Sequence, residues 1–211
     1  LASTGLTVLD IGLGPTPMLY FAVYHLDTDG GVMITGSHNP PDYNGFKMMR
    51  GKAALFGADI QALGEIAAAG DFETGDGVVR QVAVFDDYVA RLAQDGQDIA
   101  DLNVVWDCGN GAAGEATEAL VAKLPGRHKV LFGDIDGTFP NHHPDPTVPE
   151  YLQDLMAAVA EDGADLGIAF DGDGDRIGVI DAKGNVLWGD QLMVVLARDL
   201  LARRPGETVI V

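Results

Sequence analysis

Residues 166–181 have the sequence LGIAFDGDGDRIGVID, in which two short apolar segments flank an acidic loop. The segments 166–170 and 177–181 have the length and composition of buried strands. Between them, residues 171–176 alternate three aspartates with two glycines and end on an arginine. The stretch therefore predicts two strands of a sheet joined by a loop whose charged side chains form a functional site.

Strands and helices alternate on both sides of this unit. The expected strands upstream lie at residues 102–106 and 129–132, and the expected helices occupy residues 115–124 and 149–162. Downstream, a helix is expected at residues 191–204, followed by the start of a strand at 208–211. This alternation predicts a mixed α/β fold with largely parallel sheets and flanking helices.

The first part of the chain has a similar pattern with weaker signals. Thr16 followed by Pro17 predicts the N-cap and the first residue of a helix. Expected strands then occupy residues 31–35, 46–49 and 78–84, and an alanine-rich helix occupies residues 59–69. A polar loop at residues 36–45 separates the first two strands.

These patterns divide the chain into two consecutive domains and the start of a third. We place the first at residues 1–82, the second at 83–188 and the third from 189 to 211. The sequence starts without Met and ends within an expected strand. We therefore expect a chain that is truncated at both ends.

Composition excludes several classes of function. The formal net charge of −19 argues against binding to nucleic acid or to an anionic membrane surface. No apolar run reaches the roughly 18 to 20 residues that a membrane-spanning helix needs, and the start lacks the features of a signal peptide. Cys108 is the single cysteine, which excludes an internal disulfide and favours a cytoplasmic location.

The acidic loop predicts a metal site. The glycines allow the carboxylates of Asp171, Asp173 and Asp175 to converge, and three oxygen ligands suit Mg²⁺. An EF-hand is excluded, because it requires Gly and Glu where Arg176 and Ala182 stand. Arg176 is a candidate phosphate ligand. A solvated acidic turn and a salt bridge from Arg176 to the aspartates remain the alternatives.

A second candidate site lies in residues 35–41, TGSHNPP. Ser37 follows an expected strand, and two prolines stiffen the chain after it, which suits a nucleophile or a phosphate carrier with His38 beside it. It is not a hydrolase elbow, since Asn39 stands where Gly is needed. Lys47 returns towards Ser37 as a positive charge or proton donor. The alternatives are a capped turn and a solvated lysine.

Two other motifs predict different functions. Residues 109–114, GNGAAG, fit the dinucleotide-binding fingerprint, with Asp134 placed to bind a ribose. Residues 134–138, DIDGT, match the nucleophile motif of haloacid-dehalogenase-type phosphatases. The first leaves Ser37 and the acidic loop unexplained, and the prolines after residue 139 disfavour the second. A metal-stabilised binding module is the non-enzymatic alternative.

Three segments together resemble the α-D-phosphohexomutase superfamily. Residues 31–47, GVMITGSHNPPDYNGFK, resemble its phosphoserine loop, and residues 171–176 resemble its metal loop. Residues 139–146, FPNHHPDP, are most similar to its phosphomannomutase/phosphoglucomutase branch. The histidines of that segment, His142 and His143, are expected in a solvated loop, with ligand contact as the alternative. The resemblance covers nearly the whole chain.

The resemblance implies a mutase that interconverts hexose 6-phosphate and hexose 1-phosphate, with mannose or glucose as the sugar. The phosphate would be carried on Ser37 and would pass through a hexose 1,6-bisphosphate. Lys47 and His38 would assist catalysis, and Arg176 would bind the substrate. The implied Mg²⁺ ligands are a phosphate oxygen on Ser37 and the carboxylates of Asp171, Asp173 and Asp175.

The family has four domains, so the resemblance also implies that this stretch is inactive alone. A phosphosugar is the expected partner, and the expected assembly is a monomer or dimer. We expect Ser37 Oγ to face the aspartates across about one phosphate's width, with the metal within bonding distance of the seryl phosphate. Lys47 and Arg176 should line the same cleft, at an apolar interface between the first two domains.

Overall fold

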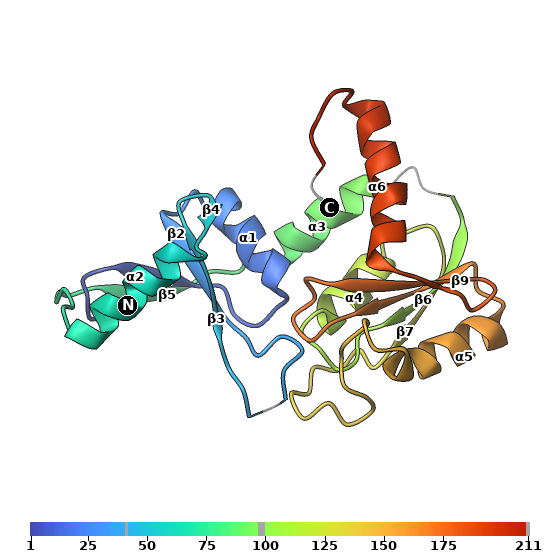
Figure 1. The fold of residues 1–211 in the computed structure, drawn as a ribbon, viewed down its shortest axis with the longest axis horizontal. Coiled ribbons are helices and arrows are strands. Elements are labelled where there is room, and N and C mark those ends of the chain that lie inside the picture. Colours follow the sequence, from blue (N-terminus) through green and yellow to red (C-terminus); the bar gives the residue numbers. More distant parts are fainter. Residues whose placement is uncertain (41, 97–99, 210–211) are drawn as a thin grey trace.

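The computed structural model describes residues 1–40, 42–96 and 100–209, and it has a mixed α/β architecture (Figure 1). Elements of the first 82 residues lie on one side of the molecule, and a five-stranded sheet lies on the other. Among the described residues, no helix combines the length and the apolar character needed to cross a membrane. The strand expected at residues 208–211 lies partly outside the described residues.

The five-stranded sheet has the order β10-β9-β8-β6-β7. Its strands are β6 (Leu102–Asp107), β7 (Gly126–Leu131), β8 (Leu166–Phe170), β9 (Ile177–Asp181) and β10 (Val186–Leu187). Strand β6 pairs in parallel with β7 and β8, whereas the β8–β9 and β9–β10 pairs are antiparallel.

Mixed pairing is confirmed, but the expectation of largely parallel sheets is too strong. The acidic loop spans only residues 171–176, and a parallel connection needs a crossover of about a dozen residues or more. Strand β9 must therefore turn back antiparallel to β8. The two-residue strand β10, which the sequence analysis did not identify, extends the same antiparallel edge.

A compact apolar core lies under this sheet. Helix α5 (Gln153–Asp162) follows a 3₁₀ turn, η1 (Pro149–Leu152), and packs against β6 and β8. The side chains of Val105, Leu155, Val159 and Ile180 are almost fully buried in one cluster. This core supports the two strands that carry the acidic loop.

Residues 1–82, called the first block below, contain two small sheets, and residues 83–188 are called the second block. Strand β1 (Thr7–Asp10) pairs in parallel with β5 (Val78–Gln81), and β2 (Gly30–Ile34), β3 (Phe46–Arg50) and β4 (Ala53–Ala54) form an antiparallel sheet. Strands β1 and β4 were not predicted from the sequence. Helix α2 (Ala58–Ala69), which is described throughout, contains no buried residue.

The two blocks meet through apolar side chains, as expected. Helix α1 (Thr16–His25) contacts α3 (Phe85–Asp95), which in turn contacts α4 (Gly114–Val121) (Figure 1). Their shared cluster contains Met18, Ala22, Val84, Tyr88 and Ala116. Helix α6 (Gly189–Arg203), also described throughout, has no buried residue.

Helix α1 begins differently from the sequence-based prediction. Thr16 is its first helical residue, and the N-cap is Pro15, whose ring cannot cap with a hydrogen bond. The predicted N-cap role of Thr16 is therefore wrong. Its hydroxyl instead donates to a carboxylate of the acidic loop.

Candidate active site

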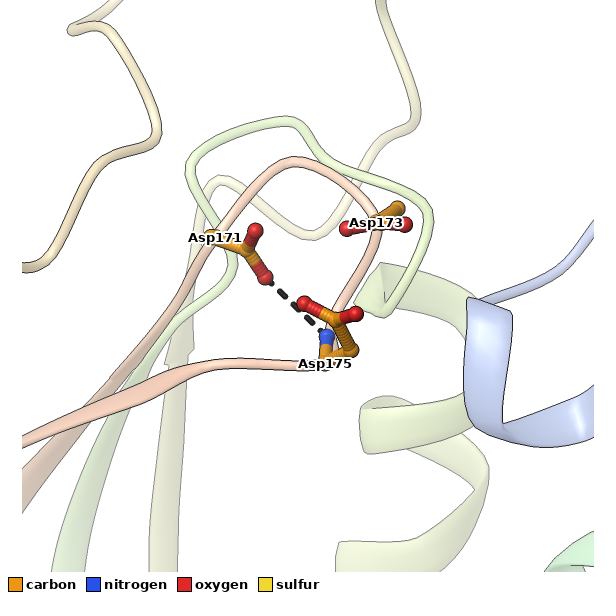
Figure 2. A group of neighbouring side chains, drawn as sticks. All are labelled: Asp171, Asp173 and Asp175. Atoms are coloured by element: carbon orange, nitrogen blue, oxygen red, sulfur yellow. Dashed lines mark hydrogen bonds between the residues drawn. The ribbon is translucent and has the colours of Figure 1, made fainter. Parts of the chain in front are cut away.

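The three aspartates of the acidic loop converge, as Figure 2 shows. Each offers a carboxylate oxygen, and these oxygens lie within 4.8 Å of one another. Asp171 and Asp173 are buried, whereas Asp175 is exposed. The backbone N–H groups of Asp175 and Arg176 both donate to Asp171 Oδ1 at 3.0 Å. The loop backbone therefore fixes the orientation of the Asp171 carboxylate.

Burial and hydrogen bonding act in opposite directions on the two buried carboxyls. Burial raises the pKa of Asp171, against the hydrogen bonds from Arg176 and Ser37. Burial also acts to raise the pKa of Asp173, but hydrogen bonds from three side chains outweigh it and the pKa is lowered. Asp173 is therefore held in its charged form, whereas burial opposes the charged form of Asp171, which a nearby cation would stabilise.

Ser37 lies directly against these two carboxylates, although more than a hundred residues separate it from them. Its Oγ is 2.9 Å from Asp171 Oδ2 and 2.9 Å from Asp173 Oδ1. The expected gap of one phosphate's width is wrong for this structure, because the serine hydroxyl is itself a donor that the buried carboxylates accept. Ser37 has a left-handed φ of +50°, a conformation that non-glycine residues rarely adopt.

The backbones of the two loops also touch. Gly172 approaches the Ser37 carbonyl so closely that a side chain at position 172 would collide with it. The Ser37 N–H donates to Thr35 Oγ1 at 2.8 Å, which helps to hold the turn. A glycine in the acidic loop is therefore needed for the serine to reach the carboxylates.

The two predicted cations line the same site. Strand pairing places Lys47 opposite Met33, and its Nζ lies 2.5 Å from both Asp173 Oδ2 and Asp175 Oδ2. Burial acts to lower the Lys47 pKa, but the two carboxylates outweigh it and raise the pKa. Arg176 Nε donates to Asp171 Oδ2 at 3.1 Å, so the salt bridge considered for it is present. Among the described residues, its buried Nη2 has no hydrogen-bond partner.

His38 lies beside the serine, and His143 of another loop contacts its carbonyl. His38 Nδ1 is 3.4 Å from Ser37 Oγ. His143 Nε2 hydrogen-bonds the His38 carbonyl, and His142 Nε2 lies 3.0 Å from buried Asp107. The expectation that His142 and His143 lie in a solvated loop is wrong. Both are half-buried, because the loop folds back onto the serine loop.

Thr16 also belongs to this site, although its sequence context predicted only a helix cap. Thr16 is fully buried, its Oγ1 lies 2.5 Å from Asp173 Oδ2, and its N–H donates to the Asp173 carbonyl at 2.8 Å. Nothing in its immediate sequence distinguishes a capping threonine from one that reaches across to another domain. Its place at the start of a helix was the one available signal.

The two other motifs do not form sites of their own kind in the structure: the glycines of GNGAAG serve packing, and the DIDGT aspartates lie outside the acidic group. The space beside Gly111 is filled by the backbone of Gly172, and the space beside Gly109 by His142 and Pro144. These glycines therefore allow loops of the site to pack closely. Within the described chain, the convergent acidic group consists of Asp171, Asp173 and Asp175, and the aspartates of the DIDGT motif are not part of it.

The donor set fits a hard divalent cation. The Asp171 and Asp173 oxygens next to Ser37 Oγ, together with Asp175, make an all-oxygen group that can hold a metal ion. Such ligands are the ones that Mg²⁺ and similar cations prefer. Lys47 supplies positive charge to the same carboxylates.

Two family models match the chain. The model for phosphoglucomutase/phosphomannomutase α/β/α domain I matches residues 1–74, and the model for domain II of the same family matches residues 86–184. These matches support neither the dinucleotide-binding nor the phosphatase interpretation.

Curated relatives agree with the models. The chain is 45% identical over 210 residues to a phosphomannomutase/phosphoglucomutase of Pseudomonas aeruginosa, covering all of the chain and 45% of the relative. It is 44% identical over 209 residues to a phosphoglucomutase of Neisseria meningitidis, covering 98% of the chain and 45% of the relative. The chain thus spans a little under half the length of these relatives.

Solved structures show the same likeness. A phosphoglucomutase/phosphomannomutase family protein from Burkholderia thailandensis superimposes with a TM-score of 0.92 at 43% identity, covering 98% of this chain and 47% of that one. A protein from Thermus thermophilus described as a phosphomannomutase superimposes with a TM-score of 0.79 at 26% identity, covering 97% of this chain and 48% of that one. The fold, the convergent site and these matches together show that the chain belongs to the phosphoglucomutase/phosphomannomutase family.

Proposed function

We propose that the protein is a hexose-phosphate mutase in which Ser37 carries the transferred phosphoryl group. The observation that carries the proposal is the position of Ser37 Oγ, 2.9 Å from carboxylate oxygens of both Asp171 and Asp173. The substrates are hexose 6-phosphate and hexose 1-phosphate, with mannose, glucose or both as the sugar. A hexose 1,6-bisphosphate connects them.

In this proposal Asp171, Asp173 and Asp175 hold Mg²⁺ together with a phosphate oxygen on Ser37. When bound, the ion supplies positive charge that stabilises the phosphoryl oxygens during transfer. The fit rests on the convergence of three carboxylates from one short loop.

The chain's own residues position the reacting groups. The phosphoryl group leaves Ser37 Oγ as a sugar hydroxyl bonds to phosphorus, and the hydroxyl proton must be accepted nearby. Lys47, which the same carboxylates hold as an ammonium, is placed to donate a proton to Ser37 Oγ as the phosphoryl group leaves, and it then takes up the proton of the sugar hydroxyl. The unpartnered Nη2 of Arg176 is available to bind a phosphate oxygen. His38, beside Ser37, completes the catalytic group.

The proposed organisation follows the family. Residues 1–82 form the part that carries the phosphoserine loop, residues 83–188 carry the metal loop, and residues 189–211 begin a further domain. We propose a cytoplasmic enzyme, monomeric or dimeric, that binds a phosphosugar and neither nucleic acid nor membrane.

The direct test replaces Ser37 with alanine in the full-length protein. Ser37→Ala should lower mutase turnover by about 10⁵-fold or more, because the group that accepts the phosphoryl is lost. The circular dichroism spectrum and melting temperature should stay close to those of the unchanged protein. Measured turnover near the unchanged rate would remove Ser37 from the mechanism.

The sequence offers a matched control, since Ser3 is the other serine of the 211 residues and is exposed. Ser3→Ala should leave turnover unchanged. Intact-mass measurement should show an added phosphoryl group of about 80 Da in the unchanged protein and in Ser3→Ala. The same addition in Ser37→Ala would contradict the proposal.

A further inference from the structure

Thr16 makes two hydrogen bonds to one residue of the acidic loop. Its backbone N–H donates to the Asp173 carbonyl at 2.8 Å, and its Oγ1 lies 2.5 Å from Asp173 Oδ2. Both residues are buried, and they belong to different blocks of the molecule. Thr16 therefore holds the backbone and the carboxylate of Asp173 together.

The two oxygens of Asp173 have separate partners. Oδ2 accepts from Thr16 and Lys47, whereas Oδ1 faces Ser37. Holding Oδ2 leaves Oδ1 directed at the serine. Asp173 Oδ1 is therefore the oxygen that faces Ser37 and the place where a metal ion would bind.

The two buried carboxylates are fixed in different ways. Asp171 Oδ1 is held by backbone N–H groups of its own loop. Among the described residues, the Asp173 carboxylate accepts hydrogen bonds from side chains alone, those of Thr16, Ser37 and Lys47. In the proposed function Ser37 and Lys47 take part in the chemistry, so Thr16 is the partner whose bond persists throughout.

Thr16 is held in place by the packing of the helix that it begins. Thr16 is the first residue of α1, and Met18 and Ala22 of that helix belong to the apolar cluster shared with α3 and α4. The preceding Pro15 packs closely against Gly174 of the acidic loop. Figure 2 shows the start of this blue helix on the side of the loop where Asp173 lies.

We propose that Thr16 is a positioning residue of the metal loop, which orients Asp173 across the boundary between the two blocks. The proposal rests on the proposed function, because it assigns a role towards the metal that the aspartates hold. Partners that orient metal ligands typically change metal affinity by about 10–100-fold when they are removed.

The test measures Mg²⁺ binding to the full chain by isothermal titration calorimetry. Thr16→Val keeps the shape of the side chain and removes its hydroxyl, so Mg²⁺ affinity should fall by about 10–100-fold. Thr16→Ser restores the hydroxyl and should recover most of the affinity. Serine restores the hydroxyl but not the methyl group of threonine, so it would not repair a packing defect. Recovery of Mg²⁺ affinity in Thr16→Ser therefore identifies the hydrogen bond as the cause.

Thr117 provides a matched control. It is also buried in the first turn of a helix, and its hydroxyl donates to the Ala113 carbonyl at 2.8 Å. Thr117→Val should leave Mg²⁺ affinity within about twofold, because no carboxylate depends on that hydroxyl. Melting temperatures of the three variants identify any that fail to fold, and Thr16→Ala, which also lacks the hydroxyl, takes the place of Thr16→Val if that protein does not fold.

The outcomes separate this inference from the proposed function. Unchanged Mg²⁺ affinity in a folded Thr16→Val protein would overturn the positioning role and leave the proposed function intact. Affinity that stays low in Thr16→Ser would also overturn the role of the hydroxyl. If the unchanged protein binds no Mg²⁺, the proposed metal centre fails, and the role of Thr16 towards it fails with it.

Discussion

The two loops of the site stand on very different supports. The acidic loop joins β8 and β9, which lie over a core where Leu155 and Ile180 are fully buried. The serine loop joins β2 and β3, and the strand residues at its two ends, Ile34 and Phe46, are 64% and 65% exposed. One loop is fixed by the core of its own sheet, and the other has little core of its own.

The serine loop is instead held by the block that carries the metal loop. Ser37 hydrogen-bonds two of the aspartates, its carbonyl rests against Gly172, and the His38 carbonyl accepts from His143. The reactive serine is thus positioned by tertiary contacts with its partner loop. A change in either loop should therefore affect the geometry of the other.

The largest expected effect tests the unequal support directly. Leu155→Ala should lower the free energy of unfolding of the second block by about 2–5 kcal/mol, because it opens a cavity in a closed core. Ile34→Ala in β2, where the side chain is 64% exposed, should cost about 1 kcal/mol or less. Denaturant titration followed by Trp fluorescence and circular dichroism measures both, and equal losses would contradict the comparison.

The next effect tests the contact between the loops. Gly172→Ala places a Cβ against the Ser37 carbonyl, so the serine must move away from the aspartates. Turnover of the full-length protein should fall about 100-fold, since displacement of a reacting group by about 1 Å costs that much. Gly137→Ala is the control, because its Cβ meets nothing within 4 Å. Turnover that is equal in both variants would show that the contact is unimportant.

The smallest effect concerns His142, which hydrogen-bonds buried Asp107 in the block that carries the metal loop. Burial acts to lower the pKa of His142, but the hydrogen bond and charge of Asp107 outweigh it and raise the pKa above 6.5. The His142–Asp107 pair should therefore make its full contribution to stability below pH 6.5 and lose it as the pH rises through the raised pKa of His142. His142→Gln should cost on the order of 1 kcal/mol below pH 6.5 and less above the raised pKa.

Denaturant midpoints of the unchanged protein and His142→Gln, measured from pH 5.5 to 9, follow the difference. Other groups act on His142 from the elements around it: the charge of Asp154 in α5 and the carbonyl of His143, and both favour its charged form. His128→Gln is a suitable control, since that histidine bonds Trp106 and a carbonyl rather than a carboxylate. A difference that grows with rising pH would refute the assigned charge state.

Parts of the site were predictable because their signals are local. Asp171, Asp173 and Asp175 alternate with glycines, so their convergence follows from the chain within six residues. Ser37 lies in the loop between the paired strands β2 and β3 and Lys47 lies at the start of β3, so their place in one hairpin also follows from a short stretch. The role of Ser37 stays a prediction that the experiments above test, and the roles of His38, Lys47 and Arg176 in catalysis and binding stay predictions.

Other parts were not predictable, for reasons that differ. The two-residue strands β4 and β10 are too short to produce a hydrophobic period. The antiparallel pairing of β9 follows from the short loop at residues 171–176. That length is visible in the sequence, but the prediction of largely parallel sheets was based on the general alternation of strands and helices. Thr16 looked like a helix cap, because its sequence context gives no sign of a carboxylate 157 positions away.

By itself, the sequence determined the mixed α/β class, the acidic loop, the serine loop and the family resemblance. Each of these depends on residues close together in the chain, where backbone freedom and hydrophobic period act directly. Only the tertiary structure decided that Thr16 binds Asp173, that His143 supports the His38 carbonyl, and that Ser37 touches the aspartates without a gap. Those contacts join distant segments, and they form because buried carboxylates and carbonyls must find donors wherever folding brings them.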